Sequence, residues 1–545
     1  MSDRWRSSPM PPYSYISSTS DTAAPASSMR DDDPSSSHPP YNNTNAVQDP
    51  PLTPALPPPM MSMSTSTATP PSTSTPLSDI PLEKLHQQLL PITIPHTSLK
   101  AHFTNWGQSY TCSPSVVFEP ETEEQCAVIL EVARREGETV RAAGVGHSPS
   151  DLACTKGYML RTEKLCRVLE VNTEKRYVVA EGGITLNALH AALAEHGLAM
   201  INVGSISDQT LAGVVTTATH GTGLGFKVIS THVQALVLLL ADGSRRRCSR
   251  NEHAELFMAS LCGLGSTGLI LQIQMEVGPA FRLKERQTSL GFTEVVDRLD
   301  AYASASEHVR LWWFPQADTI RLSCADRTTE PRKPAASFLW HSVIGYHVVQ
   351  FLLFVGIYVR AINPWIARLT VWLDRAPTLT VDDSWRVFNL DCKYPQFTTE
   401  WALPYTSTAA CLLELRTWLD NEHRSPTGLR PHFPLEIRFS DQDDIWLSPS
   451  SGTRTTWIGI IQYKPYGFNV PYRKLFAQFE AILAKHGGRP HWAKAHSLKP
   501  VELRRLYPRC VSVSSLFSWQ VNERNQRLFF FSHTDSTTLS ESWKT

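Results

Sequence analysis

Two stretches of small and hydroxyl-bearing residues, each close behind an apolar segment, constrain the fold of this chain most. The first is GVGHSPS at 144–150, and the second lies at 204–225 in GSISDQTLAGVVTTATHGTGLG. Glycine lets the backbone approach a ligand closely, and successive N–H groups in such a turn form an anion-binding nest. Ser148 and Ser150 add hydroxyl donors, and Pro149 stiffens the turn. Both a pair of loops that clamp a diphosphate and a pair of ordinary turns fit this pattern.

The segments around these loops carry alternating helix and strand signals. Apolar residues at helical spacing predict helices over 120–136, 185–197 and 253–262. Short apolar or alternating runs predict strands over 139–144, 176–183, 233–243 and 269–277. Helices and strands mix without strict strand–helix–strand alternation, so we expect an α+β fold.

One segment matches the G-x-G-x-x-G pattern of dinucleotide-binding loops in sequence but not in its structural context. The segment 263–268 reads GLGSTG, but that mechanism needs a strand before the glycines and a helix after them. Here the predicted helix precedes the motif and the predicted strand follows it. We therefore interpret it as a tight helix-to-strand connection.

Composition narrows the class of protein. Lys plus Arg and Asp plus Glu both total 51, and a balanced charge gives no support for nucleic-acid binding. The 10 cysteines are scattered without a CxxC pair, which is typical of reduced thiols and points to no metal site. Residues 1–85 are dominated by Ser, Thr and Pro, and we expect this tail to be disordered.

A charged pair stands in a predicted strand late in the chain. In PLEIRFS, Glu436 and Arg438 are two residues apart, so a strand directs both side chains to one face. An acid beside a permanent cation suits alcohol oxidation, and it also suits a plain salt bridge. The sequence alone leaves both interpretations open.

Five motifs then occur in a characteristic order: AAGVGHSPSD, GSISDQTLAGVVTTATHGTG, EWALP (400–404), LEIR (435–438) and RPHWAK (489–494). The set, over about residues 98–508, resembles the sugar-lactone oxidases of the vanillyl-alcohol-oxidase flavoprotein superfamily, which include D-arabinono-1,4-lactone and L-gulonolactone oxidases. The resemblance implies a two-part FAD-binding domain of the PCMH type at 98–280. A mixed α/β substrate cap at 281–545 would follow, with its HWAK segment returning to the flavin.

The resemblance also implies a site and a reaction. Catalysis would fall to Glu436, Arg438 and Lys494, and His147 would carry a covalent bond to FAD. For Trp401 of EWALP it suggests a structural role. The expected cofactor-binding residues are Gly144, Val145, Gly146, His147, Ser148, Pro149, Ser150, Gly204, Ser205, Thr216, Thr219, His220, Gly221, Gly223, Gly268, His491 and Lys494.

The implied reaction oxidises the 2-hydroxyl of an aldono-1,4-lactone, foremost D-arabinono-1,4-lactone, with O2 as the acceptor and H2O2 as a product. The product would be the ascorbate-type dehydro-D-arabinono-1,4-lactone. Two alternatives stay open: a dehydrogenase that passes electrons to cytochrome c or another acceptor, and a catalytically inactive membrane-associated relative.

The most apolar stretch of the chain lies at 340–366. Three interpretations fit it: an interfacial helix, a buried helix and a membrane span. The resemblance implies a mitochondrial membrane, the outer one with the protein facing the cytosol, and a cytoplasmic location is the alternative. After residue 509 the sequence departs from the family's pattern, which puts stability or cofactor retention in question.

Overall fold

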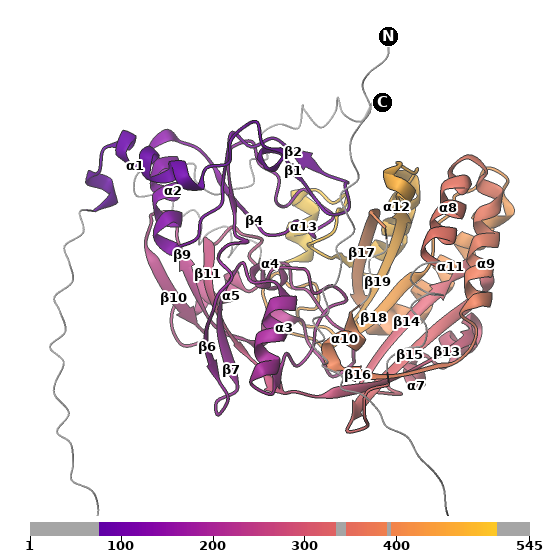
Figure 1. Ribbon diagram of the computed structural model, residues 1–545. Helices are drawn as coiled ribbons and strands as arrows, with labels where there is room; N and C mark the ends of the chain where they lie inside the picture. The colour runs from indigo at the N-terminus through magenta and orange to yellow at the C-terminus, as the bar shows by residue number, and fades with distance from the viewer. Residues whose placement is uncertain (1–75, 334–344, 390–393, 510–545) are drawn as a thin grey trace, which may run out of the picture. The chain divides into compact units, whose positions relative to one another are not determined.

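The computed structural model describes residues 76–333, 345–389 and 394–509. Within them an N-terminal half carries several small sheets and a later half carries one large sheet (Figure 1). The proposed disorder of residues 1–75 and the divergent segment 510–545 lie outside the described residues. The predicted tail extended to residue 85, but Leu77–Asp79 and α1 (Leu82–Leu89) are helical because Leu85 and Leu89 pack in the hydrophobic core against α2 (Glu123–Glu136).

The helices and strands of the N-terminal half follow the predicted pattern closely. A parallel sheet has the order β3 (Val116–Phe118), β5 (Tyr158–Arg161), β4 (Val140–Ala143). An antiparallel sheet has the order β10 (Arg245–Ser249), β9 (Val233–Leu239), β11 (Leu269–Glu276), β7 (Tyr177–Glu181), β6 (Val168–Asn172). Two further pairs join β1 (Phe103–Thr104) to β2 (Thr111–Cys112) and β8 (Leu198–Ala199) to β12 (Gly278–Pro279).

Local chemistry explains the ends of these helices. The side chain of Thr122 caps α2 by accepting from the N–H of Gln125, and Gly137 ends the helix with φ +72°. Thr185 caps α3 (Leu186–Glu195) in the same way. The short helices α4 (Leu211–Thr216) and α5 (Ala254–Ser260) complete this half. The GLGSTG segment does join a helix, α5, to a strand, β11, so its interpretation as a helix-to-strand connection is confirmed.

The later half is organised by an antiparallel sheet that begins at Arg282. Its order is β16 (Thr378–Asp383), β13 (Arg282–Gly291), β15 (Thr319–Thr328), β14 (His308–Phe314), β18 (Leu435–Ser440), β19 (Thr455–Tyr463), β17 (Gln396–Pro404), β20 (Arg489–Pro490). The helices here are α6 (Phe292–Asp297), α7 (Leu299–Ala303), α8 (Gly345–Tyr358), α9 (Asn363–Leu373), α10 (Ser384–Phe388), α11 (Thr408–Arg424), α12 (Arg473–Lys485) and α13 (Pro500–Leu506). The combination of both halves confirms the α+β class.

The two faces of the large sheet have different roles. Leu311, Ile437 and Ile458 share one face, which forms a hydrophobic core with α6, α11 and α12 (Figure 1). Trp457 and Ala402 share the other face and join the hydrophobic core of the N-terminal half. Side chains that alternate with the first set therefore point toward the N-terminal half, where the two glycine-rich loops lie.

The apolar segment at 340–366 does not form one continuous helix in its described part. It is divided between α8 and α9, with a short 3-10 turn at Arg360–Ile362 between them. None of the helices in the described ranges combines the length and hydrophobicity needed to cross a bilayer.

Candidate active site

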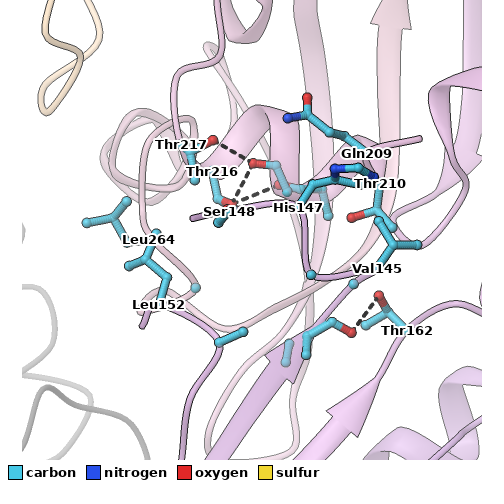
Figure 2. A pocket seen from close by; sticks show the side chains of 18 of the residues that line it. Val145, His147, Ser148, Leu152, Thr162, Gln209, Thr210, Thr216, Thr217 and Leu264 are labelled. Atoms are coloured by element: carbon cyan, nitrogen blue, oxygen red, sulfur yellow. Dashed lines mark hydrogen bonds between the residues drawn. The ribbon is translucent and has the colours of Figure 1, made fainter. Parts of the chain in front are cut away.

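A cavity lies where the first glycine-rich loop meets the second (Figure 2). The loop after β4 lines one side, and residues 209–219 of the second loop and α4 line another. The helix-to-strand connection contributes Leu264, Gly265 and Gly268, so the rejected dinucleotide motif still borders the cavity. Ala493, from the C-terminal HWAK segment, also reaches the lining.

The first loop has the form of an anion nest. The backbone N–H groups of residues 145–148 donate to no atom of the described residues. Gly146 has φ +78°, and a side chain on it would lie 3.2 Å from the ring of Phe103. A Cβ on Gly144 would lie 2.4 Å from Oγ1 of Thr210. The two loops thus touch each other where only hydrogen fits, and the unpaired N–H donors belong to residues that line the cavity.

His147 is set into this cavity next to the nest (Figure 2). Its ring stacks on Trp106 with centroids 5.7 Å apart, and Nδ1 is buried without a hydrogen-bond partner among the described residues. Burial lowers the pKa of His147, so the ring is neutral near pH 7. A neutral imidazole with a free nitrogen is available as a nucleophile or as an acceptor.

The cavity contains about half of the expected cofactor-binding residues. Those in its lining are Gly144, Val145, Gly146, His147, Ser148, Thr216, Thr219 and Gly268. Those outside it are Pro149, Ser150, Gly204, Ser205, His220, Gly221, Gly223, His491 and Lys494. Thr216 lines the cavity as expected, but its hydroxyl proton is already used, because it donates to the carbonyl of Ala212 within α4. Residues 204 and 205 and 220–223 instead run from the cavity toward the large sheet.

The structure shows why that second loop leaves the cavity. The N–H of Gly223 donates to the carbonyl of Phe439 on β18, at 2.9 Å. Ser205 Oγ and the carbonyl of His220 accept from Nη1 of Arg438, at 3.3 and 3.5 Å. A Cβ on Gly221 would overlap the amide of Asn202, since their distance would be 2.2 Å. The loop therefore connects the cavity to the strand that carries Glu436 and Arg438.

Glu436 and Arg438 do share one face of β18. Oε2 of Glu436 lies 3.6 Å from Nε of Arg438, and the Glu436 side chain remains 25% exposed whereas Arg438 is buried. On β14, Arg310 lies directly opposite Arg438, and its Nη1 is 3.9 Å from Oε1 of Glu436. A partly exposed carboxylate thus stands between two guanidinium groups.

A buried carboxylate, that of Glu400, anchors this group, and the sequence interpretation assigned it no role. Its Oε1 accepts from Nη2 of Arg438 at 2.9 Å and contacts Nε2 of His220 at 3.2 Å. Nζ of Lys494 lies 3.8 Å from Oε2. Although burial opposes the charge, Arg438, His220 and Lys494 hold the pKa of Glu400 well below its ordinary value. The available signal was a single acid within the otherwise uncharged run QFTTEWALP.

Two histidines complete the cluster and are uncharged. Burial, followed by the Arg438 charge, lowers the pKa of His220, whose ring stacks on Trp457 at 3.7 Å. Burial lowers the pKa of His491 well below its ordinary value, and the N–H of His491 donates to the carbonyl of Glu400. Trp401, expected to be structural, is buried in the core on the opposite face.

His220, Glu400 and His491 also bring three ligand atoms within 4.8 Å of one another, as a metal site would. Arg438 and Lys494 already compensate the single carboxylate, so a divalent ion there would meet two cations at short range. The cluster is therefore better suited to holding the guanidinium group of Arg438 in place than to binding a metal.

A glycine-rich nest suited to a phosphate group, a neutral histidine and an acid–arginine pair fit the site of a flavin-dependent oxidoreductase. A family model described as D-arabinono-1,4-lactone oxidase matches residues 273–516, and one described as FAD binding domain matches 114–249. The L-gulonolactone oxidase of Scyliorhinus torazame is 42% identical over 407 residues, 74% of this chain and 92% of that protein. The L-gulono-1,4-lactone dehydrogenase of Mycobacterium tuberculosis is 30% identical over 410 residues, 74% of this chain and 92% of that protein.

Solved structures agree on the fold. A structure titled "Solvent-stable cholesterol oxidase" superposes with a TM-score of 0.61 at 18% identity, covering 73% of this chain and 87% of that one. The chain belongs to the aldonolactone oxidase family of vanillyl-alcohol-oxidase-type flavoenzymes. It is an FAD-dependent oxidoreductase that acts on aldonolactones.

Proposed function

We propose that this enzyme oxidises the 2-hydroxyl of D-arabinono-1,4-lactone with O2 as the acceptor, giving dehydro-D-arabinono-1,4-lactone and H2O2. The observation that carries the proposal is the position of Glu436 between Arg438 and Arg310, on a strand joined to the cavity by the second glycine-rich loop. The match of the D-arabinono-1,4-lactone oxidase family model across 273–516, which contains Glu436, Arg438 and Lys494, supports this substrate.

Each residue has a distinct part in the reaction. The N–H groups of 145–148 would bind the diphosphate of FAD, and the bound flavin would supply the two-electron acceptor that oxidation of the 2-hydroxyl requires. Glu436, partly exposed, accepts the proton of the 2-hydroxyl. Arg438 stabilises the negative charge that develops on the 2-oxygen as its proton passes to Glu436, and Glu400 holds Arg438 in place. Lys494 adds a second positive charge, with Nζ 3.8 Å from Oε2 of Glu400.

The identity of the electron acceptor is tested by comparing two products. The purified enzyme is given D-arabinono-1,4-lactone under air, and H2O2 is measured against the reduction of added cytochrome c. Stoichiometric peroxide supports the oxidase. Cytochrome c reduction without peroxide assigns the protein to the dehydrogenases, and failure of every lactone to bleach the flavin assigns it to the inactive relatives.

L-Gulono-1,4-lactone is the second candidate substrate, because the Scyliorhinus L-gulonolactone oxidase is 42% identical to this chain. The ratio of kcat/KM for the two lactones decides between them. A ratio in favour of the gulono compound overturns the first assignment while leaving the chemistry intact.

We further propose that FAD is attached covalently through His147. The buried, neutral and unpartnered Nδ1 supports this assignment, since an imidazole nucleophile must be deprotonated. Acid precipitation of the wild-type protein is expected to give a fluorescent yellow pellet, and His147→Ala a colourless one. A yellow pellet from the variant places the bond elsewhere, and a colourless wild-type pellet means that binding is noncovalent.

For location, we propose a mitochondrial outer membrane facing the cytosol, with a cytoplasmic enzyme as the alternative. The support is an exposed apolar surface on α8 and α9, which consists of Val348, Phe351, Tyr358, Trp365, Leu369, Trp372 and Leu373. Arg368 and Arg375 lie over the rings of Trp365 and Trp372, where they can meet anionic headgroups.

Flotation with anionic vesicles tests this surface. The double variant Phe351→Ser/Trp365→Ser is expected to abolish flotation. Leu99→Ser, which changes an exposed leucine outside α8 and α9, is expected to leave flotation intact. Wild-type protein that stays at the bottom of the gradient favours the cytoplasmic alternative.

A further inference from the structure

Arg310 is a buried cation that the fold leaves largely unbonded. It lies on β14 and is 4% exposed. Nη2 donates to the carbonyl of Phe388 at 3.2 Å, while Nε and Nη1 have no hydrogen-bond partner among the described residues. An unpaired buried donor destabilises the folded protein, and the penalty is larger when the donor is charged. Such a cost calls for a compensating partner that the protein itself does not provide.

A neighbouring arginine shows how this sheet satisfies a guanidinium group that has only a structural role. Arg321 lies on β15, on the same face as Arg310, and is also buried. It donates to Gln287, Ser289 and Thr378 and to the carbonyls of Asp374 and Ala376. The contrast means that the free donors of Arg310 are not a general feature of buried arginines in this fold.

The register of the strands places those free donors at the candidate active site. Arg310 pairs with Arg438 across β14 and β18, and Trp312 pairs with Glu436. Both Nη atoms of Arg438 are engaged, by Ser205, the carbonyl of His220 and Glu400. Nε of Arg438 and Oε1 of Glu436 have no hydrogen-bond partner among the described residues. The unsatisfied groups of the two strands therefore face one another around Glu436.

Glu436 alone does not satisfy Arg310. The 3.9 Å between Nη1 of Arg310 and Oε1 of Glu436 is a charge contact that is too long for a hydrogen bond. The Trp312 ring, 5.2 Å from the guanidinium carbon, offers a cation–π contact but no acceptor atom. What is missing is a ligand with oxygen acceptors that can lie between the two arginines.

We propose that Arg310 is a second substrate-binding residue, which donates from Nε and Nη1 to oxygen atoms of the lactone and orients its 2-hydroxyl toward Glu436. A polyhydroxylated lactone offers carbonyl and hydroxyl acceptors at the spacing a guanidinium fork requires. The assignment rests on the proposed binding of the lactone at Glu436. It adds a recognition element that lies on β14, outside every motif that identified the family.

The test compares Arg310→Met and Arg310→Lys with Arg321→Met as the matched control. Arg310→Met is expected to raise the KM of the lactone by about 10- to 100-fold, the equivalent of one or two charge-assisted hydrogen bonds, with a smaller change in kcat. Arg310→Lys, which keeps the charge but not the fork, is expected to recover part of the loss. Arg321→Met is expected to lower the melting temperature and to leave KM unchanged.

Binding is followed separately through the change in flavin absorbance when a non-reacting lactone is added under anaerobic conditions. The proposal is overturned if Arg310→Met binds and oxidises the lactone with wild-type KM, whatever its melting temperature. It is equally overturned if Arg310→Met and Arg321→Met raise KM alike. Wild-type protein whose flavin no lactone reduces would instead overturn the proposed function, and this inference with it.

Discussion

Nη2 of Arg438 donates a 2.9 Å hydrogen bond to Oε1 of Glu400, and both side chains are buried. The same carboxylate oxygen contacts Nε2 of His220, which belongs to the second glycine-rich loop. Glu400, on β17, thereby connects β18, which carries the acid–arginine pair, to the second glycine-rich loop, which borders the cavity. Its charge holds the arginine to which we assign a part in the reaction, and Glu436 approaches the same guanidinium group at Nε, 3.6 Å from its Oε2.

Glu400→Gln is therefore expected to lower both stability and kcat. Removing one member of a buried ion pair typically costs about 3–5 kcal/mol in the free energy of unfolding. The folded-state pKa of Glu400 lies below its unfolded value, so the carboxylate stabilises the protein above the unfolded value and this contribution is lost as pH falls through the folded value. Urea unfolding at several pH values should show the difference between wild type and variant shrinking toward acid pH. A difference that is constant with pH would contradict the charge argument.

Asp443→Asn supplies a comparison of opposite sign. Burial raises the pKa of Asp443 to about 6, so wild-type stability attributable to this group falls as pH rises from about 4 to 6. Asparagine can keep both contacts, to the N–H of Ile445 and to the Ser448 hydroxyl. We expect the variant to be more stable than wild type at pH 7 by up to about 3 kcal/mol, at 1.4 kcal/mol per pH unit. Equal unfolding midpoints at pH 7 would refute the prediction.

Glu436→Gln tests the proton acceptor directly. Loss of a general base typically slows the chemical step by roughly 100- to 10,000-fold. Anaerobic stopped-flow measurement of flavin reduction by the lactone should show this decrease, while flavin content and lactone binding stay close to wild type. Reduction at an unchanged rate would remove Glu436 from the reaction.

Gly144→Ala tests the contact between the two loops. The added methyl group would meet Oγ1 and Cγ2 of Thr210 at 2.4 and 2.8 Å, so one loop must move and the nest for FAD is distorted. We expect a lower ratio of flavin to protein absorbance in the purified variant. Gly225→Ala is the control, because nothing lies within 4 Å of the position its Cβ would take.

A second substitution sharpens this test. Thr210→Ala removes the two atoms that lie nearest to a methyl group on Gly144 and leaves only Cβ, at 3.2 Å, so the double variant should regain most of its flavin. If the double variant stays as depleted as Gly144→Ala, steric contact with Thr210 is not the cause.

Local patterns predicted most of the elements around the cavity. The strand 139–144, the helix 185–197 and the strand 269–277 correspond to β4, α3 and β11, because each has a hydrophobic period that its own residues determine. The shared face of Glu436 and Arg438 followed from the same reasoning. The prediction of disorder as far as residue 85 was wrong, because composition does not reveal that Leu85 packs against α2, which lies further along the chain.

The partners of Arg438 could not be predicted in this way. Glu400 reaches it from β17 across the intervening β19, and Arg310 reaches it from β14 on the other side. Strand order and register are set by tertiary packing, and neither leaves a periodic signal in the sequence of β18 itself. The placement of His220 beside Glu400 rather than in the cavity has the same origin.

The alternation of apolar and charged residues along β18 restricts which changes in chain length this strand can tolerate. Leu435, Ile437 and Phe439 fill the core on one side, while Glu436 and Arg438 face the other. A one-residue shift in the register of this strand would turn both charged side chains into the hydrophobic core and the apolar side chains outward. Insertions and deletions are therefore expected in the loops at either end of β18 rather than within the strand.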